Sequence, residues 1–535
     1  FNGEIYNHFE LRKDINLKKK INWKGTSDSE TLINFIELFG VEKFLDNASG
    51  MFAFCFYDIK TNNLILARDR FGEKPLYYTF ENNNFIFSST LKPLLKSPIN
   101  NFNINKKSLY NYFNFGFVPG SNSIISNIKK IQPGSFLKYN LKSKEIKNYK
   151  YWDIIKEFKE KRKNFSFNPT NSIDYFEKII SNSVKEQMIS DVPIGSFLSG
   201  GIDSSLTSIL MNKYSSSKIK TFNVSFENKN YDESEYANFL ASKINSNHTS
   251  LVMNDSHLKN FIPDIGNFYD EPFADSSQIP TLFVSHLASQ SVKVCLTGDG
   301  ADELFGGYNR YFFAKKICNN PLFFRNFLSK TIEKIGPYNI QKLYNIFDYF
   351  LPKNFKINMI GDKLLKLSNI LNSSNNYEVY IKLFKNSNLE DIYLEKNYEF
   401  DNSIFNLFTE LDNFTFEEKM MTVDIIYYLS DDILTKVDRG SMAFSLETRA
   451  PFLNKNVVNY AFSIPIEQKI KNQNGKIVLK KLIEKYIPDF DFKRPKTGFG
   501  IPLNEWLSGP LKEWALDNLT RNNIIETGMF NYNIF

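Results

Sequence analysis

The segment Ser199-Gly200-Gly201-Ile202-Asp203-Ser204-Ser205 decides the fold of the larger part of the chain. It follows the short apolar run 195–198 and opens the helical pattern of 206–214, so we expect a strand, a glycine-rich turn and a helix. Two glycines let the backbone approach an anion closely, and N–H groups at a helix start point at that anion. The Walker A pattern GxxxxGK[ST] is absent because no lysine follows the glycines. The segment therefore predicts a polyphosphate site unlike the NTPase P-loop, with an ordinary glycine turn as the alternative.

Strand and helix patterns alternate outward from this loop. Such alternation predicts a parallel, doubly wound α/β sheet. Beyond it, from about 310 to 490, the chain reads as mostly helical. The expected strands are 195–198, 221–226, 249–253 and 293–297, and the expected helices are 173–189, 206–214, 233–244 and 280–290.

A second segment rich in glycine and acid, TGDGADELFGGY at 297–308, follows the last expected strand. Asp203 and Asp302 could share a magnesium ion, which binds carboxylates together with phosphate oxygens. Asp299 could orient a nucleophile or a substrate amine. These residue types at a strand's end fit a metal and nucleotide site better than a core turn, and a surface Gly/Asp loop is the alternative.

Four basic residues lie late in the chain: Lys436, Arg439, Arg449 and Lys476. Departing pyrophosphate needs cations that take up its developing charge. Taken singly, however, each of the four is more typical of a solvated surface side chain. Their spacing alone does not indicate that they belong to a functional site.

The first 150 residues are rich in strand patterns and form a separate expected domain. A chain of 535 residues predicts two or more domains. The charged and polar segment 157–171, which contains Pro169, is the expected linker between a domain at 1–156 and a domain at 172–535. The expected strands of the first domain are 51–58, 64–69, 76–80 and 85–88, and 31–39 has helical spacing.

The chain opens on Phe1-Asn2-Gly3-Glu4, with no Met. Asn2 offers a side-chain amide and Gly3 a backbone N–H, which are the parts of an oxyanion hole. Asp28 could bind an amine. Taken alone, these residues would be interpreted as turns. Cys55 lies mid-strand among aromatic residues, so we expect an inert buried thiol rather than a nucleophile.

Composition excludes several classes of protein. With 42% hydrophobic and 23% charged residues, the chain is typical of globular proteins. No apolar run of about 18 residues is present, so no membrane span is expected. Three dispersed cysteines argue against a disulfide framework and favour a reducing, cytoplasmic compartment. The net charge of +7 comes from scattered Lys and Arg, so nucleic-acid binding is not expected.

Taken together and in order, these motifs resemble glutamine-hydrolysing asparagine synthetase, of the class II glutamine amidotransferases. The resemblance covers essentially the whole chain. It implies an N-terminal nucleophile (Ntn) αββα sandwich, followed by an adenine-nucleotide α-hydrolase-like domain of the ATP pyrophosphatase type. The motifs are NGEIYN (2–7), Ser27-Asp28, GMFAF (50–54), RDRFGEKPLYY (68–78), SGGIDSS (199–205), EPFADSSQIPT (271–281), TGDGADELFGGY (297–308), ETRAPFL (447–453) and KTGFGIP (496–502).

The resemblance also implies a two-part reaction on glutamine, aspartate and ATP. Glutamine is hydrolysed to ammonia, aspartate and ATP give β-aspartyl-AMP and pyrophosphate, and ammonia, carried through an internal tunnel, displaces AMP. A homodimer is compatible with the resemblance. The implied roles are oxyanion hole for Asn2 and Gly3; glutamine binding for Asn2, Gly3, Glu4 and Asp28; ATP binding for Leu198, Ser199, Gly200, Gly201, Asp203, Ser204, Val224, Thr297 and Gly298; Mg²⁺ binding for Asp203 and Asp302; and β-aspartyl-AMP chemistry for Asp299 and Lys476, with Lys436 a weaker match than Lys476.

One departure from the family pattern concerns the nucleophile. The family uses a cysteine at the mature N-terminus, whereas this chain starts at Phe1. We therefore expect an internal fragment, with several dozen residues before NGEIYN and more after 527–530. The alternatives are a β-lactam synthetase-like or sugar amidotransferase relative with another carboxylate, an ammonia-dependent synthetase, and a catalytically inactive paralogue that acts as a scaffold.

Overall fold

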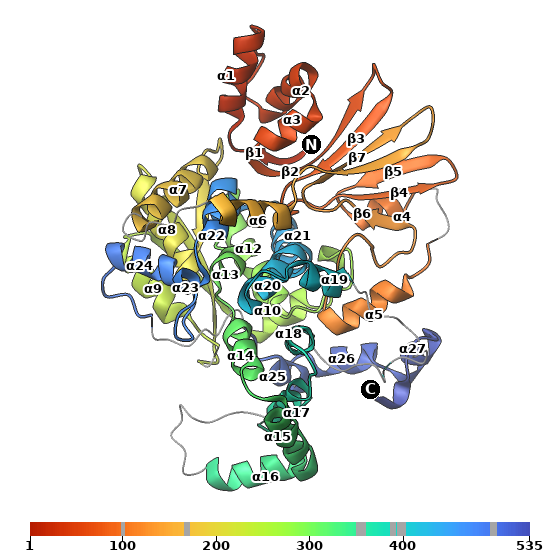
Figure 1. Cartoon of the computed structure of the whole chain (residues 1–535), viewed down its shortest axis with the longest axis vertical. Coiled ribbons are helices and arrows are strands. Elements are labelled where there is room, and N and C mark those ends of the chain that lie inside the picture. The colour runs from red at the N-terminus through yellow and green to blue at the C-terminus, as the bar shows by residue number, and fades with distance from the viewer. Residues whose placement is uncertain are drawn as a thin grey trace. The chain divides into compact units, whose positions relative to one another are not determined.

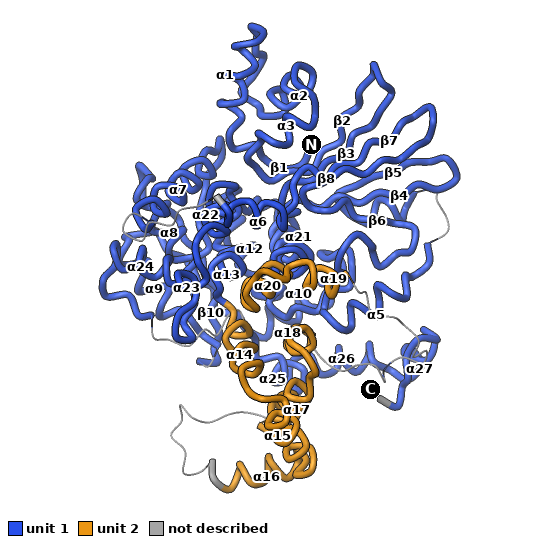
Figure 2. Tube along the Cα trace, viewed as in Figure 1, with its two compact units in different colours: residues 1–307, 389–400, 424–535 blue, residues 308–388, 401–423 orange. Residues whose placement is uncertain are grey.

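The computed structural model describes residues 1–97, 102–164, 172–229, 231–348, 360–385, 392, 403–492 and 500–534. Two compact units are present (Figure 2): unit 1 comprises 1–307, 389–400 and 424–535, and unit 2 comprises 308–388 and 401–423. In the expected linker 157–171, residues 157–164 belong to helix α6 (Ile154–Asn164), and 165–171 lie outside the described residues. The part of KTGFGIP at 496–499 also lies outside them.

Unit 1 begins with two antiparallel sheets. The first sheet has the order β1-β2-β3-β7-β8 and the second the order β5-β4-β6. The four expected strands are confirmed, and they pair as the hairpins β2–β3 and β4–β5. The strands are β1 (Asn2–Ile5), β2 (Gly50–Asp58), β3 (Asn63–Arg68), β4 (Tyr77–Glu81), β5 (Asn84–Ser88), β6 (Ile128–Lys130), β7 (Ser135–Asn140) and β8 (Ile146–Lys150).

Alternating side chains of these strands build four layers. Phe52 and Phe54 pack against the helices α1 (His8–Lys18), α2 (Asp28–Phe39) and α3 (Val41–Asn47). Ala53, between them, points to the opposite face and packs towards the second sheet, because successive strand side chains alternate. On the far side of the second sheet lie α4 (Leu91–Leu95) and α5 (Lys106–Phe115). The layers are therefore helix, sheet, sheet, helix, as the red and orange part of the chain in Figure 1 shows.

Cys55 lies on β2 in this sandwich, as expected. Burial raises the pKa of its thiol to about 11. A thiol with such a pKa is almost entirely protonated at neutral pH, so it is a poor nucleophile.

The second part of unit 1 is built on a parallel sheet with the order β11-β10-β9-β12-β13. Every neighbouring pair in it is parallel, and the strand order runs outward from β9 in both directions, which confirms the predicted doubly wound arrangement. The four predicted strands are β9 (Ile194–Phe197), β10 (Lys220–Phe226), β11 (Asn247–Met253) and β12 (Val294–Leu296). The fifth, β13 (Glu447–Arg449), was not expected, because three residues of which two are charged give no strand pattern.

Helices cover both faces of this sheet. Phe222 and Val224 of β10 pack in a hydrophobic cluster with α12 (Gln278–Ser289). Ser196 of β9 faces the other side, where its hydroxyl lies 3.0 Å from that of Ser208 on α8 (Ile202–Tyr214). Two further predicted helices, at 173–189 and 233–244, are confirmed as α7 (Ser172–Gln187) and α9 (Ser234–Lys243). The glycine loop 199–201 thus joins the carboxyl end of β9 to the start of α8.

The remaining regular elements of unit 1, and those of unit 2, are helices in the described residues. In the described residues, no helix is long and apolar enough to cross a membrane. Unit 1 adds α10 (Asp255–Phe261), α11 (Ile265–Phe268), α13 (Ala301–Phe305), the π-helix η3 (Asp424–Ile433), α21 (Leu434–Met442), η4 (Pro451–Leu453), α22 (Lys455–Ser463), α23 (Ile466–Lys469), α24 (Ile477–Tyr486), α25 (Leu503–Ser508), α26 (Lys512–Asn518), α27 (Arg521–Glu526) and η5 (Tyr532–Ile534). Unit 2 consists of α14 (Asn309–Cys318), α15 (Leu322–Ile335), α16 (Pro337–Asp348), α17 (Ile360–Leu371), α18 (Asn376–Phe384), α19 (Ser403–Glu410) and α20 (Phe416–Val423).

Candidate active site

The glycine loop is folded by its own serines. The hydroxyls of Ser199 and Ser204 lie 3.1 Å apart, and the backbone N–H of Gly201 donates to the Ser199 hydroxyl at 3.2 Å. Gly200 has φ +74°, and a Cβ there would lie 2.7 Å from the backbone of Tyr236 and Ala237. Only glycine fits this position without displacing α9. The loop therefore presents hydroxyls and the N-terminus of a 13-residue helix to the same space.

The predicted nucleotide-contacting residues Leu198 and Val224 stand beside this loop. The backbone N–H of Leu198 donates to the carbonyl of Phe222 at 2.9 Å. The register of β9 with β10 ends at Phe197 and Phe222, so Val224 lies beyond the paired segment, at the level of the loop. Since the Val224 side chain belongs to the hydrophobic cluster of α12, a ligand at the loop would meet its backbone.

The second acidic loop packs directly on the first. A Cβ on Gly298 would lie 2.6 Å from the Cβ of Asp203, so only a glycine allows this approach. The backbone N–H of Asp299 faces the Thr297 hydroxyl at 3.5 Å, and the Thr297 carbonyl accepts from Thr207 of α8 at 3.3 Å. Asp302 lies in the first turn of α13. The structure thus brings the two sequence motifs into one site.

Lys476 joins the two predicted metal ligands. Its Nζ lies 2.5 Å from Asp203 Oδ2 and 2.6 Å from Asp302 Oδ1. Burial alone would lower the pKa of Lys476, but the charges of Asp203 and Asp302 outweigh it and raise the pKa. A Cβ on Gly307 would lie 1.9 Å from Asp302 Oδ1 and 2.2 Å from Lys476 Cε, so the glycine makes room for this ion pair. The two carboxylates therefore converge on one cationic point.

A second buried lysine stands on α21. Lys436 Nζ lies 2.8 Å from Asp275 Oδ2 and donates to the Ser277 hydroxyl at 2.7 Å. Although burial alone would raise it, Lys436 lowers the pKa of Asp275 to about 2. Burial raises the pKa of Asp299, and Lys436 partly opposes this rise. Lys436 thus acts electrostatically on Asp299 as well.

The surface interpretation of the four late basic residues is wrong. Lys436, Arg439, Arg449 and Lys476 are 7%, 7%, 3% and 4% exposed. Each is buried because a carboxylate partners it: Asp275, Asp270, Glu447 and Asp203 with Asp302, respectively. The partners of Lys436, Arg439 and Lys476 lie far away in sequence, so residue spacing could not show these pairs.

The opening residues form a second group, on a strand. The interpretation of Asn2 and Gly3 as a turn is wrong, because they pair with Ala53 and Phe52 of β2. The Asn2 amide donates to the Ser89 hydroxyl at 3.4 Å. Asp28, the first residue of α2, accepts from the backbone N–H of Ile5 at 3.0 Å. The predicted glutamine-side residues are therefore gathered along β1.

Arg449 connects this group with the parallel sheet. Its guanidinium lies 3.5 Å from the Glu4 carboxylate, and its backbone carbonyl accepts from Thr297 N–H at 2.8 Å. Burial, followed by the charge of Asp28, raises the pKa of Glu4 to about 7, although Arg449 opposes the rise. The contacts of one residue thus reach both groups.

Gly3 is the position of β1 that tolerates a side chain least. Its φ is +127°, and a Cβ would lie 2.0 Å from the Met51 carbonyl oxygen. Gly3→Ala is expected to separate β1 from β2 and to lower the free energy of unfolding by about 3 kcal/mol or more, measured by chemical denaturation. Gly25→Ala is the control, since no heavy atom of the described residues beyond Gly25 and its two chain neighbours lies within 4 Å of the added Cβ, and a change within about 0.5 kcal/mol is expected. Equal stability of the two variants would contradict the close approach of β1 to β2 at Gly3.

Several residues at these sites were not singled out from the sequence. Asp275 lies in the motif EPFADSSQIPT, but nothing in the motif itself marks it as the partner of Lys436. Lys74 of RDRFGEKPLYY pairs with Asp438 at 2.8 Å, and both side chains are buried. A small cavity next to this pair is lined by Glu73, Lys74, Thr297, Asp299, Asp438 and Arg449, among others.

Comparison with known proteins gives consistent matches. The family model described as asparagine synthase matches residues 176–535, and that of the glutamine amidotransferase domain matches residues 1–152. Asparagine synthetase [glutamine-hydrolyzing] 1 of Bacillus subtilis is 34% identical over 96% of this chain and 77% of its own length. The corresponding putative enzyme 2 of Methanocaldococcus jannaschii is 34% identical over 83% of this chain and 81% of its own length. A putative asparagine synthetase of Mycobacterium tuberculosis is 30% identical over 96% and 76%.

Fold and site together define a two-part protein, in which a two-sheet sandwich precedes a parallel α/β sheet whose carboxyl end carries loops rich in glycine, serine and aspartate. The matches to two family models identify the family within this class. The chain belongs to the asparagine synthase family, with an N-terminal glutamine amidotransferase domain.

Proposed function

We propose that the chain catalyses the ATP-dependent synthesis of asparagine from aspartate, with glutamine as the nitrogen donor. The observation that carries this proposal is the convergence of Asp203, Asp302 and Lys476 at the end of the glycine loop. The names of the relatives supply the substrates, since they are glutamine-hydrolysing asparagine synthetases.

The glycine loop would hold the phosphates of ATP. Ser199, Gly200, Gly201 and Ser204 supply donors, and the adenosine side would meet Leu198, Val224, Thr297 and Gly298. Asp203 and Asp302 fit Mg²⁺, because their oxygens already converge on a cation. No group of three or more His, Cys, Asp and Glu in the described ranges could hold an ion alone. Phosphate oxygens would therefore complete the coordination, which is how Mg²⁺ is usually bound.

Mg²⁺, when bound, would supply neutralisation of the phosphate charge. In the proposed reaction, a carboxylate oxygen of aspartate attacks the α-phosphorus of ATP, and pyrophosphate leaves. Lys476, with Lys436 as the second cation, would stabilise the charge that develops on the phosphates. Ammonia then attacks the acyl carbon of β-aspartyl-AMP, and AMP leaves. Asp299 could accept a proton from the attacking ammonia, because its raised pKa makes it a stronger base than an ordinary aspartate.

Glutamine hydrolysis is assigned to the first domain, proposed to span 1–156 and to have the N-terminal nucleophile fold. Asn2 and Gly3 would form the oxyanion hole, and Glu4 and Asp28 would bind glutamine. The four-layer sandwich and the amidotransferase match support this assignment. The synthetase domain is proposed to span 172–535. A cytoplasmic location and a homodimer stay predictions.

Aspartate-dependent release of pyrophosphate tests the proposed function. With ATP, Mg²⁺, aspartate and an ammonium salt, the chain should release pyrophosphate and form AMP and asparagine in equal amounts. Ammonium makes the assay independent of the glutaminase nucleophile. Release at the same rate without aspartate would refute asparagine synthesis and favour a relative that adenylates another carboxylate. No release with any carboxylate would favour the inactive paralogue.

A further inference from the structure

Two buried lysines, Lys436 and Lys130, stand between the same two segments of the synthetase part. One segment is the connection 269–277 between α11 and α12, and the other is the continuous helix formed by η3 and α21. Lys436 belongs to α21 and reaches Asp275 of the connection. Lys130 comes from β6 of the sandwich and reaches a carboxylate on each segment. The sandwich thus contributes a second cation that contacts both of the segments that Lys436 connects.

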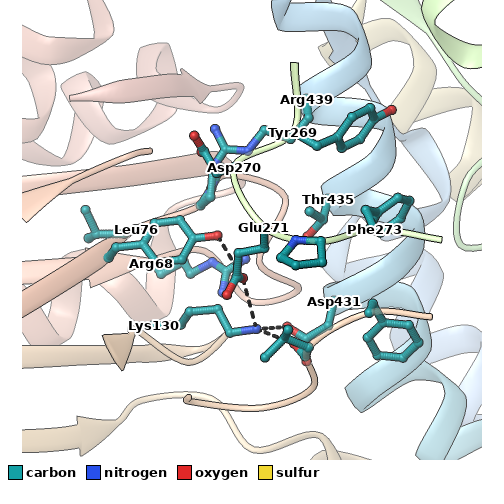
Figure 3. A pocket seen from close by; sticks show the side chains of 15 residues that line it. Arg68, Leu76, Lys130, Tyr269, Asp270, Glu271, Phe273, Asp431, Thr435 and Arg439 are labelled. Carbon is teal, nitrogen blue, oxygen red and sulfur yellow. Dashed lines mark hydrogen bonds and ion pairs between the residues drawn. The ribbon is translucent and has the colours of Figure 1, made fainter. Parts of the chain in front are cut away.

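The surroundings of Lys130 are visible in Figure 3. Its Nζ lies 3.5 Å from Asp431 Oδ1 of η3 and 3.9 Å from Glu271 Oε2 of the connection. It also donates to the carbonyl of Val118. The side chains of Lys130, Asp431 and Glu271 are 8%, 7% and 13% exposed. Ion pairs with so little exposure are screened only weakly by solvent.

Both carboxylates are fixed to the sandwich by further hydrogen bonds. Glu271 accepts from Ile124 N–H at 2.6 Å and from the Tyr77 hydroxyl at 3.3 Å. Asp431 accepts from Gly120 N–H at 2.7 Å. The connection makes one more contact, in which Ala274 N–H donates to the Gly116 carbonyl at 2.8 Å. Each segment that carries one half of the Lys436–Asp275 pair is therefore attached to the sandwich close to that pair.

The spacing along the chain makes this attachment short. Glu271 precedes Asp275 by four residues, and Asp431 precedes Lys436 by five, across the junction of η3 with α21. The π-helical turns are an uncommon geometry that is often found at functional sites. A shift of either carboxylate would be passed to Asp275 or Lys436 through four or five residues of backbone.

We propose that Lys130 is a positioning residue, through which the amidotransferase sandwich sets the distance between Lys436 and Asp275 in the adenylation site. The inference rests on the proposed function. Lys130 touches no substrate in this scheme. It draws Glu271 and Asp431 towards one ammonium, and so holds the connection and α21 at the separation that the Lys436–Asp275 pair needs.

Removing the Lys130 charge should therefore impair adenylation through Lys436. In Lys130→Met, aspartate-dependent ATP–pyrophosphate exchange is expected to fall about 10- to 100-fold, because small displacements of positioned groups have such effects. Lys130→Arg, which keeps the cation, should recover most of the rate. Lys138→Met is the matched control, since Lys138 makes an exposed ion pair with Glu42 on the same sandwich, and its rate should equal that of the wild type.

A double-mutant cycle separates positioning from general destabilisation. If Lys130 acts through Lys436, the double variant Lys130→Met, Lys436→Met should be no slower than Lys436→Met alone, within about twofold. Multiplication of the two single effects, or a Lys130→Met enzyme as fast as the wild type, would overturn the proposal. If Lys130→Met does not fold, the same cycle is run with Tyr77→Phe, which removes the hydrogen bond from the Tyr77 hydroxyl to Glu271, and the same two outcomes support or overturn the proposal.

The assay also distinguishes this inference from the proposed function. A wild-type chain that shows no aspartate-dependent exchange would refute both. If the wild type is active but the rate losses of Lys130→Met and Lys436→Met multiply in the double variant, only the positioning role of Lys130 is refuted.

Discussion

Asp203→Asn is expected to reduce aspartate-dependent ATP–pyrophosphate exchange by at least about 100-fold. The substitution keeps the shape of the side chain. This matters because Gly298 packs so closely against Asp203 that a side chain of another shape would disturb the contact. It removes one of two carboxylates that converge on Lys476, together with half of the proposed Mg²⁺ site. Folding should be nearly unaffected, since Lys476 still pairs with Asp302. The rate loss should therefore appear without a matching loss of stability.

Asp489→Asn is the control for this prediction. Asp489 is also paired with a lysine, Lys243, but its side chain is 57% exposed. Exposed ion pairs contribute about 1 kcal/mol or less, so neither rate nor stability should change much. An Asp203→Asn enzyme that exchanges pyrophosphate at the wild-type rate would refute the assignment of the metal and phosphate site.

The sequence predicted those parts of the fold that have local signals. Each strand of four or more residues in the parallel sheet, and the helices beside it, showed in the alternation of apolar runs and helical spacing. The pattern failed for β13, whose residues Glu447 and Arg449 are charged and whose partner β12 lies about 150 residues earlier. It failed also for β1, because Gly3 is typical of a turn, whereas here glycine is required by the close approach of β2.

The acidic residues of the two loops and the convergence of Asp203 with Asp302 were predictable, but the pairing of carboxylates with buried lysines was not. The glycines and carboxylates of the two loops carry motif signals, and both loops end parallel strands. The buried lysines Lys436 and Lys476 carry no such signal. Lys436 and Asp275 are 161 residues apart, and Lys476 and Asp203 are 273 apart, so no window of sequence contains either pair. A lysine is usually exposed, and only tertiary packing shows which ones are not.

Lys476→Met is expected to affect both activity and stability. Asp203 and Asp302 would then face each other in a buried site without the ammonium that lies between them, and loss of one partner of a buried ion pair costs about 3–5 kcal/mol. The exchange rate should fall at least about 100-fold, because the cation nearest the proposed phosphate site is lost. Lys485→Met is the matched control on α24, the helix that begins directly after Lys476, since its side chain is 51% exposed and pairs with Asp174 and Glu177.

Magnesium alone provides a second measurement on the same variant. If Asp203 and Asp302 form a divalent-cation site, adding MgCl₂ without ATP should raise the melting temperature of Lys476→Met, since the ion can take the place of the ammonium. The wild type and Lys485→Met should respond less, because Lys476 competes with the ion for the same two carboxylates. Equal shifts in all three proteins would contradict the metal assignment, whereas a shift confined to Lys476→Met would show that lysine and metal share one position. In that case ATP binding with Mg²⁺ must move the Lys476 ammonium from between the carboxylates towards the phosphates, which is where its proposed role in adenylation requires it to be.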